Sequence, residues 1–286
     1  ISGGGFASLS DLIAEAAAGK RYEYLFNKAG STLVTNGASS LWGLGPSPAA
    51  GVASLAAPGG IAPTSATLGA FPFGNPTSPD TQHFVSGFIT ATGQTRTLLL
   101  YDRLFGVAKT MASTATKAVT GVPTRYQNTS GIAADSIRGN FLFVEVGATA
   151  LAATAHNWTV CTYLNQDNAT VTLPSLVGNA SAIVRRLDHP LGQWFAPLAA
   201  GDTGIKALTQ MQASASVATG LIDFVIGHPI AWFPVPLASV VCIVDGINSA
   251  FNLARIFDNA ALAFLEVLPS GTGATTYAGS FTAVAG

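Results

Sequence analysis

Residues 157–173 read Asn-Trp-Thr-Val-Cys-Thr-Tyr-Leu-Asn-Gln-Asp-Asn-Ala-Thr-Val-Thr-Leu. β-branched and aromatic residues flank the tetrapeptide Asn165-Gln-Asp-Asn168, whose residue types favour a tight turn. The segment therefore predicts a β-hairpin with strands at 157–164 and 169–173. Because successive side chains of a strand point to opposite faces, we expect Trp158 and Val160 to point inward and Thr159 outward.

Similar short apolar runs, separated by turn residues, recur throughout the chain after residue 139. Their spacing is typical of a β-sandwich or barrel, and we predict a mainly β fold with a self-contained β-sandwich over 139–286. The expected strands outside the hairpin cover residues 140–146, 182–187, 194–198, 205–213, 221–226, 229–233, 240–244, 260–268 and 275–284.

A connecting region is predicted over 82–138. It begins with strands at 83–91 and 95–101 around a Thr-Gly turn. Residues 102–110 follow as a short helix, and the polar stretch after them is irregular.

The N-terminal region, residues 1–81, combines one helix with a long extended arm. Leu9–Ala18 has helical periodicity, a Ser8 cap and a Gly19 stop, and a strand at 21–27 follows. Residues 29–80 are rich in Pro and Gly yet carry apolar residues, so they predict an arm laid on another protein. The alternative is a loop-rich layer on the chain's own domain. The residues expected at the interface of the arm are Leu41, Trp42, Leu44, Phe71 and Phe73.

Charged residues are unusually scarce in this chain. Asp, Glu, Lys and Arg make up 9% of the 286 residues, whereas about 25% is usual. Much of the surface is therefore expected to be covered by other protein, which predicts self-association as a dimer or trimer. The alternative is a secreted domain with a Ser-, Thr- and Gly-rich surface. A net charge of −1 with no basic stripe predicts no nucleic-acid partner.

No membrane span or leader is predicted. Residues 224–244 carry no formal charge, but their three prolines argue against a spanning helix. Residues 1–10 lack the basic start and apolar core of a signal peptide. Cys161 and Cys242 lie in apolar runs, and the sequence leaves open whether they form a disulfide.

Motifs of known chemistry are missing from the sequence. It contains no Gly-x-Ser-x-Gly, P-loop, Gly-x-Gly-x-x-Gly or His-Glu-x-x-His motif, and its histidines are far apart. Asp188-His189 is the best acid–base fragment, although the following proline favours a simple turn. We therefore predict no catalytic residue, no cofactor and no metal ligand, while scattered carboxylates leave a glycosidase pair open.

Several longer phrases occur together in a characteristic order, and they resemble a group of tailed-phage virion proteins encoded among head genes. The resemblance covers about residues 8–286. The phrases that carry it are Leu100-Tyr-Asp-Arg-Leu-Phe105, Lys109-Thr-Met-Ala-Ser-Thr-Ala115, Thr120-Gly-Val-Pro-Thr-Arg125, Gly201-Asp-Thr-Gly204, His228-Pro-Ile-Ala-Trp-Phe-Pro234, Phe257-Asp-Asn-Ala-Ala-Leu-Ala-Phe-Leu265 and Leu268-Pro-Ser-Gly271.

This resemblance implies a capsid cement or decoration protein whose β-sandwich, over 139–286, is jelly-roll-like. Such a subunit binds the major capsid protein on the exterior of an HK97-type shell and stabilises it. Two alternatives stay open: another virion part, such as a tail, fibre or major shell protein, and a secreted carbohydrate-binding β-sandwich or hydrolase. The last would need an exposed aromatic platform or paired acids.

Overall fold

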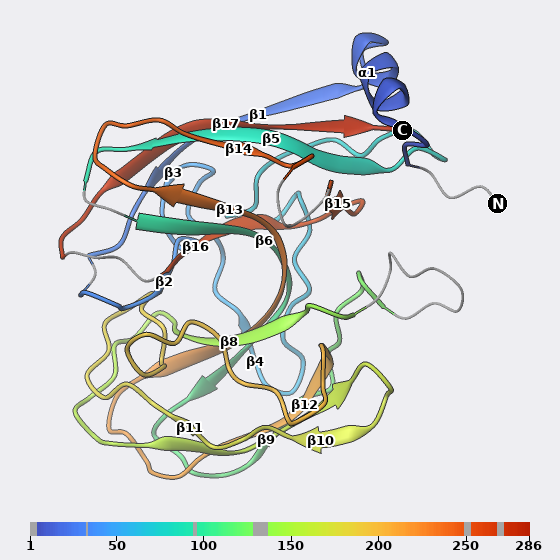
Figure 1. Cartoon of the computed structure of the whole chain (residues 1–286). Helices are drawn as coiled ribbons and strands as arrows, with labels where there is room; N and C mark the ends of the chain where they lie inside the picture. The colour runs from blue at the N-terminus through green and yellow to red at the C-terminus, as the bar shows by residue number, and fades with distance from the viewer. Residues whose placement is uncertain (1–4, 33, 94–95, 128–136, 249–252, 268–271) are drawn as a thin grey trace.

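The computed structural model describes residues 5–32, 34–93, 96–127, 137–248, 253–267 and 272–286. These residues form one short helix, α1 (Leu9–Ala17), and three sheets stacked above one another (Figure 1). We name them the upper, central and lower sheets from their places in Figure 1.

The three sheets are built mainly from antiparallel pairs. In spatial order the upper sheet contains β14 (Cys242–Asp245), β5 (Gln82–Ala91), β17 (Thr276–Ala285), β1 (Arg21–Ala29) and β3 (Pro46–Ser47), with β15 (Arg255–Ile256) beside β5. The central sheet contains β2 (Ser39–Ser40), β16 (Leu262–Val267), β6 (Arg96–Thr110), β13 (Leu221–Val235) and β8 (Phe141–Val146), with β4 (Leu55–Ala56) beside β6. The lower sheet contains β10 (Thr170–Thr172), β9 (Asn157–Asn165), β12 (Ile205–Ala213) and β7 (Lys117–Ala118), with β11 (Leu176–Val177) beside β9.

Two long strands of the central sheet, β6 and β13, connect the two halves of the molecule. They pair along their full 15-residue lengths, from Leu221 opposite Thr110 to Val235 opposite Arg96. One end of the pair packs in a core with the upper sheet, and the other end packs in a core with the lower sheet. A single sheet therefore serves two hydrophobic cores.

The Pro/Gly-rich segment covers a third apolar cluster on the central sheet. Here Ala38, Trp42 and Ala70 pack with residues of β6, β8 and β16. The segment is thus a loop-rich layer on the chain's own domain, and the alternative interpretation of residues 29–80 is the one the structure supports.

The prediction that this segment presents an interface must be corrected for most of its residues. Leu41, Trp42 and Phe71 are 0%, 4% and 1% exposed, so they belong to the core of this chain. Phe71 packs edge to face against aromatic rings of β16 and β17. Leu44 and Phe73 are partly buried and pack against the same core.

The mainly β fold is confirmed, but the predicted boundaries at 81/82 and 138/139 both cut through sheets. β1 and β5 pair with β17, and β6 pairs with β13 and β16. Residues 139–286 taken alone therefore lack the partner in eight of their twelve strand pairings. A jelly roll, which has two sheets, is not confirmed by this arrangement of three.

The expected helix at 102–110 is wrong, because these residues belong to β6. Nearly every residue of β6 is buried, since the strand has packed layers on both faces. Such a strand shows a continuous apolar run without alternation, and that run is easily mistaken for a helix. The predicted N-terminal helix is confirmed, and Ser8 Oγ accepts the Asp11 amide at 3.1 Å.

The predicted hairpin is confirmed as β9 and β10. Trp158 is 2% exposed and Thr159 is exposed, as expected. Trp158 lies opposite Ala213 and Val160 lies opposite Gln212, so β9 has one extra residue, Thr159, at this point. Val160 therefore does not share the inward face of Trp158. This β-bulge turns Cys161 inward instead.

Trp158→Ala is expected to lower the free energy of unfolding by about 3–5 kcal/mol, as truncation of a buried aromatic does. Thr159→Ala, the matched change at the exposed neighbour, is expected to cost less than about 1 kcal/mol. Urea melts of the whole chain measure both values. Equal costs would show that the burial of these two positions is wrong.

Candidate functional site

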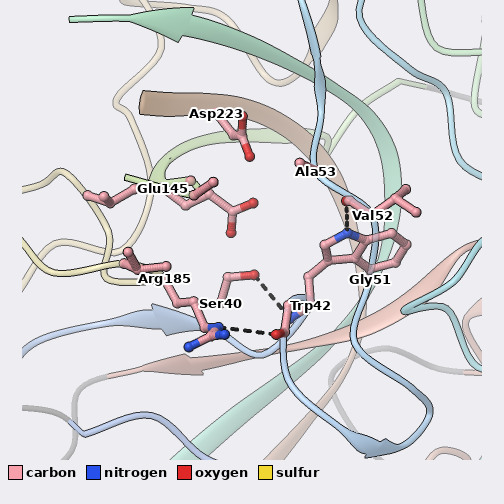
Figure 2. A pocket seen from close by; sticks show the side chains of 13 residues that line it. Ser40, Trp42, Gly51, Val52, Ala53, Glu145, Arg185 and Asp223 are labelled. Atoms are coloured by element: carbon pink, nitrogen blue, oxygen red, sulfur yellow. Dashed lines mark hydrogen bonds between the residues drawn. The ribbon is translucent and has the colours of Figure 1, made fainter. Parts of the chain in front are cut away.

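A cavity of about 170 Å³ lies between the central sheet and the Pro/Gly-rich layer. One wall comes from β8 and β13, and the opposite wall comes from the loop segment around Trp42 (Figure 2). The residues that line it are Ser40, Trp42, Gly43, Gly51, Val52, Ala53, Glu145, Val146, Gly147, Ala148, Val184, Arg185 and Asp223.

Two carboxylates point into this cavity from neighbouring strands. Glu145 on β8 and Asp223 on β13 are directly opposite in the antiparallel register. Opposite residues share one face of a sheet, and Figure 2 shows both carboxyl groups directed toward the same space. The residues are only 5% and 4% exposed, so strand pairing alone places two acids together in a largely dry site.

Glu145 has a charged partner. Arg103 Nη2 on β6 donates to Glu145 Oε1 at 2.7 Å, and both side chains are buried. The Arg103 guanidinium also lies 4.9 Å from the centre of the Trp42 ring, within cation–π range. Trp42 is held in turn by a 2.8 Å hydrogen bond from its Nε1 to the carbonyl of Val52. Trp42 therefore links the loop layer to the buried ion pair of Arg103 and Glu145.

Asp223 is less well compensated. Burial, followed by the negative charge of Glu145, raises the pKa of Asp223 to about 7, although the charge of Arg103 opposes this rise. Among the residues that the structure describes, none forms a hydrogen bond with the buried Asp223 Oδ1. Near neutral pH this carboxyl is thus divided between its acid and its carboxylate form.

Two neighbouring carboxyl groups are what the acid–base hydrolysis of a glycoside requires. The size of the cavity argues against a sugar substrate, because ligand pockets usually measure roughly 300–1,000 Å³. Glu145 is moreover engaged by Arg103. The geometry suits the binding of a small cationic group better than hydrolysis of a glycoside.

The predicted fragment Asp188-His189 serves a structural purpose. Asp188 is fully buried and accepts hydrogen bonds from Trp158 Nε1 at 2.7 Å and from the Asn179 amide at 2.6 Å. His156 Nε2 lies 3.0 Å from the same carboxylate. Burial alone would raise the pKa of Asp188, but these hydrogen bonds, that of His156 first, lower it.

The neighbouring His189 does not join this group. Its Nε2 accepts the Val144 amide at 2.9 Å, and burial lowers its pKa to about 4. Neither Asp188 nor His189 lines the cavity beside Glu145 and Asp223. The fragment therefore anchors the loop after β11 to β9 and to β8.

The two cysteines answer the question left open by the sequence. Cys161 and Cys242 are both free and buried, and they belong to different hydrophobic cores. Within the described ranges no three His, Cys, Asp or Glu side chains form a group able to hold a metal ion. In the same part of the chain no helix has the length and apolarity needed to cross a membrane.

Comparisons with known proteins give little further guidance. No family model and no curated protein matches the chain. Among solved structures, a chain from the structure of the infectious bursal disease virus Gx strain has 9% sequence identity to this chain and a TM-score of 0.20. The match covers 93% of this chain and 81% of that chain. The VP2 subviral particle of that virus is 10% identical, with 92% and 80% covered and a TM-score of 0.17. TM-scores this low carry no inference about fold or function.

The sequence analysis did not single out Glu145 or Asp223. Each is a lone acid inside an apolar strand, in Phe-Leu-Phe-Val-Glu-Val and Leu-Ile-Asp-Phe-Val-Ile. Charges are almost never buried without a partner, so a lone acid in such a strand was the available signal. Their pairing depends on a register that no local pattern reveals.

Asp223→Asn is expected to change how stability depends on pH. Because the folded-state pKa is raised, the wild type should lose stability as the pH rises from about 4 to about 7 and remain lower above it. The Asn variant should lack this loss and be more stable at pH 8, by on the order of a few kcal/mol. Urea melts at pH 5 and pH 8 measure the difference, with exposed Asp258→Asn as the control. An unchanged pH profile would contradict the assignment.

Proposed function

We propose that this chain is a non-enzymatic structural subunit of a virus particle. At a finer level, we propose a cement or decoration subunit that binds the major capsid protein on the exterior of an HK97-type phage shell. The resemblance over residues 8–286 supports the finer statement. The observation that carries the general one is an apolar row on the outer face of the upper sheet.

This row crosses four strands. Leu25 on β1 lies opposite Ser280 on β17, Ser280 lies opposite Phe88 on β5, and Phe88 lies opposite Ile243 on β14. Leu25, Phe88 and Ile243 are 73%, 42% and 77% exposed. Successive partners share one face of a sheet, so Leu25, Phe88 and Ile243 form an exposed apolar strip, which the buried Ser280 interrupts between Leu25 and Phe88.

Further apolar residues are exposed in segments that adjoin this sheet. Leu237 and Val241 precede β14, and Leu9 and Ile13 lie on α1, which stands at one end of the upper sheet in Figure 1. β14 is also an edge strand of the upper sheet. Contiguous apolar surface rimmed by polar residues marks sites of protein association. The upper face thus has the character of a contact surface.

The few charges of the chain are partly used inside it. Among the described residues, three ion pairs between arginine and a carboxylate are buried: Arg96 with Glu266, Arg103 with Glu145, and Arg125 with Asp102. These pairs leave even fewer charges for the surface than the composition suggests. A surface so poor in charge supports assembly into a larger particle.

A carbohydrate-binding platform has less support. Such platforms present exposed aromatic rings, but Trp42 and Trp158 are buried. Trp194 and Trp232 pack edge to face with their ring centres 5.2 Å apart and are partly buried. The aromatic residues therefore favour the structural role, in this virion part or another.

The double change Leu25→Glu and Ile243→Glu is expected to weaken self-association by about tenfold or more. A charge buried in an apolar contact without a partner costs several kcal/mol. Sedimentation at micromolar concentrations measures the change in oligomeric state. Val177→Glu, which alters an exposed apolar residue of the lower sheet, is the matched control.

Binding to empty shells tests the finer proposal by co-sedimentation and negative-stain imaging. The wild type and the Val177→Glu control should decorate the shells, and the double variant should not. A wild-type protein that remains monomeric and does not bind the shells would overturn the proposal.

A further inference from the structure

The acid pair in the cavity has one ion-pair partner among the described residues, and that partner is bound to Glu145. Arg103 compensates Glu145 through the 2.7 Å ion pair. Arg185, the other cation at the cavity, directs its Nε to the carbonyl of Gly43 at 3.2 Å. Within the described residues, Asp223 has no ion-pair partner. The Ser54 backbone donates a hydrogen bond to its carboxyl group, but its Oδ1 has no hydrogen-bond donor although the residue is 4% exposed.

A buried carboxylate of this kind must take up a proton or gain a cation, because an isolated buried charge is very costly. One positive charge makes the group of Arg103, Glu145 and Asp223 neutral. A divalent ion would leave it with an excess positive charge beside the Arg103 guanidinium. Simple charge balance therefore favours a monovalent cation that can also donate hydrogen bonds.

The shape and lining of the cavity indicate which monovalent cation fits. Its walls beyond the acids are largely apolar, formed by Val52, Ala53, Val146, Ala148 and Val184. Its volume of about 170 Å³ leaves space for a short alkyl chain. Lys side chains bury their methylene stems against apolar surface and place the ammonium at a polar group.

We infer that this cavity binds a primary alkylammonium group, with Asp223 as its counter-ion and Glu145 as a second acceptor. The methylene chain would lie against the apolar walls, and the ammonium would donate to the carboxylate of Asp223. A lysine of a neighbouring chain or a free alkylamine carries this group. The lysine source rests on the proposed function, whereas the binding chemistry does not.

Thermal unfolding with n-butylammonium chloride at pH 8 tests the site directly. The melting temperature of the wild type should rise by a few degrees and then level off, as for a ligand that binds only the folded state. Tetramethylammonium chloride at the same concentrations should have no such effect. Asp223→Asn keeps the shape of the side chain but removes its charge, and it should abolish the response. No rise in the wild type, or an equal rise in both proteins, would overturn the inference.

A second variant guards against indirect effects of Asp223→Asn. Ala148→Phe at the exposed side of the cavity leaves both acids in place and should also abolish the response, because it fills the space for the alkyl chain. A response that persists in this variant would place the amine elsewhere. A larger rise with calcium chloride, lost in Asp223→Asn, would replace the ammonium by a divalent cation.

Carbodiimide cross-linking of concentrated protein, followed by mass spectrometry of the peptides, separates the two sources. Asp223 or Glu145 joined to a lysine of a second chain would assign the ammonium to a neighbouring subunit. Butylammonium binding without such a cross-link would assign it to a free amine. Because the melting experiment needs only the single chain, a failure of self-association leaves its result intact.

Discussion

The pairing of β6 with β13 is the constraint on which the rest of the structure depends. Both cores contain residues of this pair, and the Pro/Gly-rich layer packs on its opposite face. Three charged residues of β6, Arg96, Asp102 and Arg103, each belong to a buried ion pair. Removing one partner of such a pair usually costs about 3–5 kcal/mol. These pairs therefore penalise a shift in register, which would separate buried charges.

Elements that depend on signals within a few residues could be predicted from the sequence. Elements that depend on packing between the sheets could not. The β9–β10 hairpin and α1 were predicted because turn residues and a capping serine act within a few residues. β6 was taken for a helix because burial on both faces removed its alternation. The segment predicted to be an arm packs on the chain's own central sheet. Its composition shows that it needs a surface to pack on, but not whether that surface belongs to the same chain or to a partner.

The candidate site shows the same limit more sharply. Glu145 and Asp223 become neighbours only through the β8–β13 register, and Arg103 reaches them from β6. Trp42 was singled out from the sequence, but as an interface residue. Its observed place over Arg103 depends on the loop layer folding back. Residue types alone could flag lone acids in apolar strands, but not their meeting in one cavity.

Charged residues are scarce in this chain, so a buried Asp223 without an ion-pair partner calls for an explanation. An asparagine in place of Asp223 would need no counter-ion and could still accept a hydrogen bond. Elsewhere in the described core, Asp102, Glu145 and Glu266 are each matched by an arginine, and Asp188 by hydrogen-bond donors. An acid left unmatched beside a cavity departs from that pattern. The departure is reasonable if the missing cation arrives from outside the chain, as it would where a neighbouring subunit completes the site.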